Sequence, residues 1–175
     1  MAKQLGFLLN QKRCIGCQSC QTACQSKNDS PVGLSLRHAD NFEYIPEGPF
    51  MTGSCYHCET PACLPVCPVG AITKREADGI VVTDLSMCIG CQRCISACPY
   101  SAPQFNAETS KSEKCDFCRS RLDENDIPAC VENCPVQALT CGDLAELEAR
   151  GGIKQGVNFK VNGTVNPSVR FILPR

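Results

Sequence analysis

Sixteen of the seventeen cysteines in this chain fall into four groups of four, and their spacing restricts its possible folds more than any other feature. The first and third groups have the spacing C-x2-C-x2-C-x3-C, and the second has C-x2-C-x4-C-x3-C. The fourth carries an eleven-residue insertion before its third cysteine. In chain order the groups are Cys14, Cys17, Cys20 and Cys24; Cys55, Cys58, Cys63 and Cys67; Cys88, Cys91, Cys94 and Cys98; and Cys115, Cys118, Cys130 and Cys134.

The residues around these cysteines repeat as well. The first group reads CIGCQSCQTAC and the third reads CIGCQRCISAC. Residues 61–72, which contain the end of the second group, read PACLPVCPVGAI, and residues 128–139 read PACVENCPVQAL. Self-similarity of this kind indicates repeated structural units. Groups one and two therefore look like an ancestral pair that recurs as groups three and four.

These spacings are typical of [4Fe–4S] clusters, in which four thiolates converge on the corners of a tetrahedron. The run C-x2-C-x2-C wraps a tight loop around three corners. The fourth cysteine, commonly followed by proline, reaches the other cluster in two-cluster ferredoxins. Cys67, Cys98 and Cys134 precede prolines in this way, whereas Cys24 precedes Gln25. The sequence therefore predicts four [4Fe–4S] clusters whose groups exchange their last ligands.

Two pairings of the groups fit this pattern. Groups two and three are separated by only a hairpin-length segment, which favours an exchange between them and leaves groups one and four to pair across the inserted unit. Pairing one with two and three with four is simpler along the chain, and spacing alone leaves both open. The first pairing predicts set 1 as Cys14, Cys17, Cys20 and Cys134; set 2 as Cys24, Cys115, Cys118 and Cys130; set 3 as Cys55, Cys58, Cys63 and Cys98; and set 4 as Cys67, Cys88, Cys91 and Cys94.

Zinc sites and disulfides account less well for so many cysteines. Zinc sites use two pairs of ligands rather than groups that end in C-x3-C-P. A disulfide scaffold belongs to secreted proteins, and residues 1–10 contain neither a long apolar region nor a cleavage site of the kind that signal peptides carry. Because every group has all four thiolates, no iron is left open for a substrate. This saturation predicts electron transfer rather than catalysis.

Composition bears on location and on partners. No stretch approaches the roughly 18 apolar residues that span a bilayer, so we expect no direct membrane span. The sequence by itself predicts a cytoplasmic protein, which only a partner bearing a signal would export. Four clusters would add a charge of about −8 to the formal −1 of the metal-free chain. Nucleic-acid binding is then not expected, since no basic patch outweighs this charge.

Few segments show regular secondary structure. Residues 79–84 read as a short strand that pairs with residues 71–73 in a hairpin, and residues 6–10 read as another strand. Residues 143–150 predict a helix with an acidic start, which Gly151 and Gly152 would end. Because the rest is loop with few large apolar groups, we expect the clusters to act as the core and iron removal to unfold the chain.

A few residues outside the groups are also candidates for a role. Cys141 is expected to be a buried small apolar residue. His57 is expected to be an ordinary surface-loop histidine, and His38 has no specific signal. Cations that flank the clusters would stabilise the reduced state, although most are expected to be merely solvated. They are Lys12, Arg13, Lys74, Arg75, Lys114 and Arg119.

The array of four groups resembles the four-cluster, electron-transfer (beta) subunit of the dimethyl sulfoxide reductase family of molybdenum and tungsten oxidoreductases. The similarity runs from residue 6 to the C-terminus. It is carried by RCIGC at 13–17, HCETPAC at 57–63, VCPVGA at 66–71, CIGC at 88–91, ACPYSAPQ at 97–104 and KCDFC at 114–118. The resemblance implies an α+β fold of two bacterial-ferredoxin-like modules, small, loop-rich and with short β-hairpins. Residues 49–104 would form a module inserted into an outer one made of residues 1–48 and 105–175. It also supports the ligand sets given above.

The resemblance further implies a large catalytic partner that carries a molybdenum- or tungsten-bound pterin. In this interpretation the chain is a non-catalytic subunit that relays single electrons between that site and a second partner, which could be a flavin-binding subunit, a membrane quinone subunit or a ferredoxin. The competing hypothesis is a free-standing soluble polyferredoxin that serves several enzymes.

Overall fold

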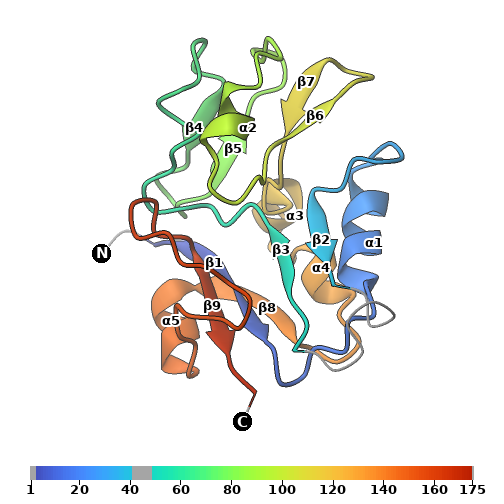
Figure 1. The fold of residues 1–175 in the computed structure, drawn as a ribbon, viewed down its shortest axis with the longest axis vertical. Helices are drawn as coiled ribbons and strands as arrows, with labels where there is room; N and C mark the ends of the chain where they lie inside the picture. The colour runs from blue at the N-terminus through green and yellow to red at the C-terminus, as the bar shows by residue number, and fades with distance from the viewer. Residues whose placement is uncertain (1–2, 41–48, 175) are drawn as a thin grey trace.

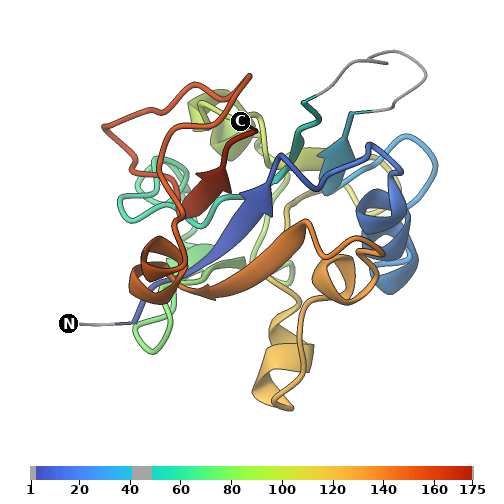
Figure 2. The same ribbon diagram turned by 90° about the horizontal axis from the view of Figure 1, so that it is seen from below.

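A three-stranded sheet joins the two ends of the chain in the computed structural model, which describes residues 3–40 and 49–174. Its central strand is β1 (Leu5–Asn10), antiparallel to β8 (Leu139–Asp143) and parallel to β9 (Val169–Ile172). Helix α5 (Leu144–Ala149) follows β8 directly and lies beside the sheet in Figures 1 and 2. The strand expected at residues 6–10 is confirmed, and its partners begin at Leu139, which pairs with Leu9.

The remaining strands form three two-stranded ribbons. They are β2 (Arg37–Ala39) with β3 (Thr52–Ser54), β4 (Ile72–Lys74) with β5 (Val81–Thr83), and β6 (Gln104–Asn106) with β7 (Lys111–Glu113). The second of these ribbons is the hairpin expected at residues 71–84. It lies at the opposite end of the molecule from α5 in Figure 1.

The helices are short. They are α1 (Ser19–Lys27), α2 (Arg93–Ala97), α3 (Arg119–Asp123), α4 (Ala129–Glu132) and α5. The helix expected at residues 143–150 is confirmed as α5. Asp143 acts as its N-cap, and its carboxylate accepts a hydrogen bond from the backbone N–H of Ala145 at 2.9 Å.

The sequence repeat between groups one and three extends to the backbone. Gly16 and Gly90 have φ values of 65° and 68°, and Gln18 and Gln92 both have φ of 59°. A tight loop therefore leads each group into a helix. Helix α2 stops at Ala97 because the residue before a proline is restricted to extended conformations. Helix α1 continues to Lys27, since no proline follows Cys24.

The core contains more apolar packing than the sequence led us to expect. Phe7 stacks on Phe117 with ring centroids 4.3 Å apart, and Phe159 packs on Phe171 at 4.8 Å. These rings belong to one buried cluster that also includes Cys55, Cys115 and Cys130. The cysteines thus line an aromatic and aliphatic core instead of replacing it.

The molecule is a small mixed structure of short helices and strands. Within its described residues, no helix has the length and apolar character that crossing a membrane would need.

Candidate metal centres

Three cavities are each lined by four of the predicted ligands. One is lined by set 3 and one by set 1, and each contains about 380 Å³ of space free of protein atoms, its opening included. A third is lined by set 4 and contains about 320 Å³. Cys134 thus lies with cysteines of group one, and Cys98 lies with cysteines of group two. Within residues 3–40 and 49–174, no three His, Cys, Asp or Glu side chains are placed to hold a single metal ion.

The cysteines of set 2 come together where α1 packs against α4. The thiol of Cys24 has its pKa raised to about 12, mainly by burial, and Cys130 and Cys118 are among its electrostatic neighbours. Cys115 is buried, and its pKa is raised well above the usual value by burial, with Cys130 and Cys24 again contributing. The structure therefore gathers all sixteen predicted ligands into four neighbourhoods.

The neighbourhoods follow one another in space. Cys130 of set 2 is an electrostatic neighbour of Cys20 in set 1. Cys55 of set 3 is likewise an electrostatic neighbour of Cys115 in set 2. Sets 3 and 4 share a small apolar cluster that contains Cys63 and Cys94. The order in space is therefore 1, 2, 3, 4.

Backbone N–H groups point at the last cysteine of three groups. The N–H groups of Ala71, Ala102 and Ala138 donate to the sulfurs four residues earlier. These contacts measure 3.3 Å to Cys67, 3.5 Å to Cys98 and 3.2 Å to Cys134. Such donors stabilise a thiolate and raise the reduction potential of a cluster bound to it.

Cys67 shows the electrostatic effect of these donors. Burial acts to raise the pKa of its thiol, but the N–H groups of the four residues from Val69 to Ile72 outweigh burial and lower the pKa overall. The loop that follows the cysteine is therefore arranged for a negatively charged sulfur.

Most other thiols have raised pKa values. Burial is the main cause for Cys58, whose pKa is about 12, and for Cys63, whose pKa is about 11. The neighbouring thiols Cys55 and Cys98 add to the effect. Without metal these groups carry protons at neutral pH, so metal binding must release them.

One buried cation was not predicted from the sequence. Arg37, the first residue of β2, is 1% exposed. Its Nη1 donates to Thr52 Oγ1 at 3.1 Å, and its Nη2 donates to Ser54 Oγ at 2.9 Å. Nothing in the sequence near Arg37 indicates burial, because its hydroxyl partners belong to a strand 15 residues further along.

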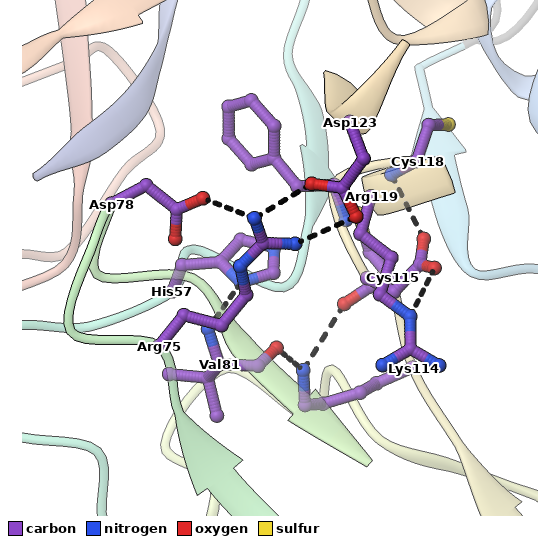
Figure 3. Close-up of polar contacts among 11 residues, drawn as sticks. His57, Arg75, Asp78, Val81, Lys114, Cys115, Cys118, Arg119 and Asp123 are labelled. Carbon is purple, nitrogen blue, oxygen red and sulfur yellow. Dashed lines mark hydrogen bonds and ion pairs between the residues drawn. The ribbon is translucent and has the colours of Figure 1, made fainter. Parts of the chain in front are cut away.

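Lys114 is a second buried cation and is thus one of the flanking cations that are not solvated. Its Nζ donates to the carbonyl oxygens of Val81 and Cys115, as Figure 3 shows, and the side chain lines the cavity of set 3. Lys12, Arg13 and Arg119 are exposed as expected. Arg75 forms ion pairs with Asp123 at 2.7 Å and with Asp78 at 3.1 Å.

The expectation for His57 is also wrong. This residue is fully buried, and its Nδ1 accepts a hydrogen bond from the backbone N–H of Val81 at 3.1 Å. Burial lowers its pKa well below the usual value, and the nearby cation of Lys114 adds to that effect. The imidazole is therefore neutral and belongs to the core, where it packs edge-on against Phe117.

Cys141 lines none of the three cavities, although Cys130 and Cys118 of set 2 are among its electrostatic neighbours. It lies on β8 opposite Phe7 and is partly buried against the core. Burial raises its pKa to about 11.

The two outer neighbourhoods reach the surface. Cys17 in set 1 and Cys91 in set 4 are exposed. The isoleucines at matching positions of the repeat, Ile15 and Ile89, are 50% and 62% exposed.

Comparison with known proteins gives matches over most of the sequence. A family described as a 4Fe-4S dicluster domain matches residues 47–144, and one described as a 4Fe-4S binding domain matches residues 11–28. The sequence is 42% identical over 169 residues to the probable anaerobic dimethyl sulfoxide reductase chain YnfG of Escherichia coli K12, an alignment that covers 87% of this chain and 80% of that protein. It is 40% identical over 164 residues to the thiosulfate reductase electron transfer subunit PhsB of Salmonella typhi, covering 89% of this chain and 84% of that protein. It is 42% identical over 150 residues to a tetrathionate reductase subunit of Salmonella typhimurium, covering 82% of this chain and 60% of that protein.

Proposed function

This chain is a member of the family of iron–sulfur electron-transfer subunits of dimethyl sulfoxide reductase-type oxidoreductases, and we propose that it relays single electrons through four [4Fe–4S] clusters. The electrons would pass between a molybdenum- or tungsten-pterin catalytic subunit and a second redox partner. The observation that carries the proposal is the grouping of the cysteines, four at a time, around three separate cavities.

The donor set fits this cofactor. Each neighbourhood offers four thiols, and N–H groups point at the sulfurs of Cys67, Cys98 and Cys134. Two buried cations, Arg37 and Lys114, lie among the neighbourhoods and would offset the negative charge of thiolates. When bound, a [4Fe–4S] cluster accepts and returns one electron without a change of ligands.

The proposed ligands are the four sets. Sets 1 and 2 would belong to an outer module of residues 1–48 and 105–175, and sets 3 and 4 to an inserted module of residues 49–104. Within each set all four cysteines would bind iron, which leaves no coordination position for a substrate. The chain would therefore conduct electrons, and the chemical conversion would take place in its partner.

The ends of the row would be the points of exchange. Cys17 and Cys91 are exposed at opposite ends of the order 1, 2, 3, 4. An electron can enter near one of them and leave near the other, while the cysteines of sets 2 and 3 lie between. A flavin, a quinone or a ferredoxin site could serve as the second partner.

The test is purification of the chain from its native source under anaerobic conditions, followed by metal analysis and mass determination. We expect about sixteen irons per chain, the count for four cubanes. We also expect a stable, much larger partner that contains molybdenum or tungsten. An isolated brown monomer would favour the free polyferredoxin, and a colourless zinc protein would rule out both functions.

A further inference from the structure

Arg37 is a buried cation that lacks the usual partner. Its side chain donates to two hydroxyl groups, and among the described residues no carboxylate lies within ion-pair distance of it. Its Nε is also buried and has no hydrogen-bond acceptor in the described part of the chain. An unpaired charge in a protein interior is strongly unfavourable, because the ion loses its hydration and gains no counter-charge. Some other negative charge must therefore compensate for it.

The residues that contact Arg37 are themselves in contact with, or adjacent in sequence to, cysteines of three of the four sets. Thr52, which accepts from Nη1, also lies 3.5 Å from the Sγ of Cys20 in set 1. Ser54, which accepts from Nη2, directly precedes Cys55 of set 3.

On its other side the guanidinium lies 4.7 Å from the centre of the Phe7 ring. Phe7 in turn stacks on Phe117, the residue between Cys115 and Cys118 in sequence. Both rings are buried, so water does not separate the cation from set 2 on this face.

The groups near Arg37 that would become negative when iron binds are the sulfurs of predicted ligands. Burial acts to lower the pKa of Arg37, but Cys130, Cys115, Cys20 and Cys24 outweigh it and raise the pKa. Arg37 in turn opposes the effect of burial on the thiols of Cys20, Cys24 and Cys115. Three of these four cysteines belong to set 2 and one to set 1.

We propose that Arg37 is a positioning residue for electron transfer, whose fixed positive charge raises the reduction potentials of the clusters at sets 1 and 2. The inference rests on the proposed function. A cluster that gains one electron becomes more negative by one unit, and a cation held nearby stabilises that form. The charge acts strongly because it is buried and little screened by salt. No proton need accompany the electron, since arginine stays protonated at every accessible pH.

An arginine suits this place better than other cations. The planar guanidinium contacts two hydroxyl groups on one strand at once, which fixes the charge between the two sets. The flexible ammonium of a lysine would keep the charge but lose one of these anchors.

The experiment is a redox titration of the purified holoprotein, reduced stepwise with dithionite and followed by electron paramagnetic resonance. Four forms are compared: wild type, Arg37→Gln, Arg37→Lys and Arg119→Gln. Arg119 is the matched control, because it lies next to Cys118 but its side chain is 48% exposed.

We expect Arg37→Gln to lower the ratio of reduced to oxidised cluster, at a fixed potential, by about tenfold for two of the four signals. A tenfold change corresponds to about 59 mV for one electron. Arg37→Lys should stay within about threefold of wild type, and Arg119→Gln should be close to wild type because exposed charges are screened. The shift should persist in high salt.

Unchanged midpoints for every signal in Arg37→Gln would overturn the inference. If Arg37→Gln fails to bind iron, the iron content of Arg37→Lys distinguishes the two explanations. Full iron loading of Arg37→Lys with wild-type potentials supports a requirement for the positive charge. An equal loss of iron in both variants would overturn the inference and indicate a purely structural residue. Failure of the proposed function would show separately, as a wild-type protein with fewer than four clusters.

Discussion

Asn28 donates a hydrogen bond from its side-chain amide to the Sγ of Cys24, over 3.6 Å. It stands four residues after the cysteine, where the other three groups have an alanine whose backbone N–H contacts the sulfur. Because no proline follows Cys24, α1 continues, and the backbone N–H of Asn28 bonds to the carbonyl oxygen of Cys24 at 3.2 Å. The backbone N–H of Asn28 is thus used within the helix, and the side-chain amide of Asn28 donates to the sulfur instead.

Replacement of Asn28 by alanine should therefore lower the reduction potential of one cluster. The lost hydrogen bond to a charged sulfur is worth roughly 1.5 kcal/mol at most in this exposed position. The effect should appear in one signal of a redox titration followed by electron paramagnetic resonance. Ser26→Ala, also on α1, serves as the control. Identical midpoints in the two variants would contradict the role given to Asn28.

The proposed ligand sets can be distinguished from the simpler pairing by double variants. Cys134→Ser and Cys14→Ser should damage the same cluster, so combining them should cost no more than about four irons. Cys134→Ser with Cys88→Ser should damage two clusters and cost about eight irons, whereas the simpler pairing places these two cysteines on one cluster. Iron analysis of the purified proteins measures this. The reverse pattern would require a different exchange of ligands.

The seventeenth cysteine should be dispensable for metal binding. Cys141→Ala is expected to keep the wild-type iron content and to lower the free energy of unfolding by about 1 kcal/mol, since the thiol is partly buried on β8. Chemical denaturation and iron analysis check the two parts. A drop of about four irons, one whole cubane, would mean that Cys141 is a ligand after all.

Removal of iron should abolish the cooperative unfolding transition. Among the described residues, the small buried cluster that joins Cys63 of set 3 to Cys94 of set 4 contains only Ile72 and Val81 besides these cysteines, which is too little to hold this end of the molecule together without metal. Calorimetry before and after anaerobic chelation measures the change. An unchanged melting curve would show that the aromatic core around Phe7 and Phe171 suffices for the whole chain.

The sequence predicted local elements well and distant ones poorly. The hairpin β4/β5 and helix α5 were found because their signals lie close together along the chain. The sheet partners of β1 were not predicted, because the sequences of β8 and β9 have no strong strand pattern. They pair with β1 only in the folded chain.

The sequence pattern also located the cysteines better than their surroundings. His57 lies in a short loop between two cysteines, which suggests exposure, yet Val81 from a later hairpin donates to its ring. Arg37 was missed for the same reason: its burial depends on Phe7, Thr52 and Ser54, which are distant in sequence. Spacing reveals which residues can share a metal, whereas tertiary contacts determine which charges lie beside them.

The position of β1 between β8 and β9 has a consequence for biosynthesis. Of the three strands in this sheet, the central one leaves the ribosome before its neighbours, and its parallel partner, which ends at Ile172, leaves after them. The cysteines around the cavities of sets 3 and 4 are complete once Cys98 has emerged, whereas Cys14 must wait for Cys134. A nascent chain would therefore offer the cysteines of sets 3 and 4 early and those of sets 1 and 2 late, and the delivery of iron during translation would follow that order.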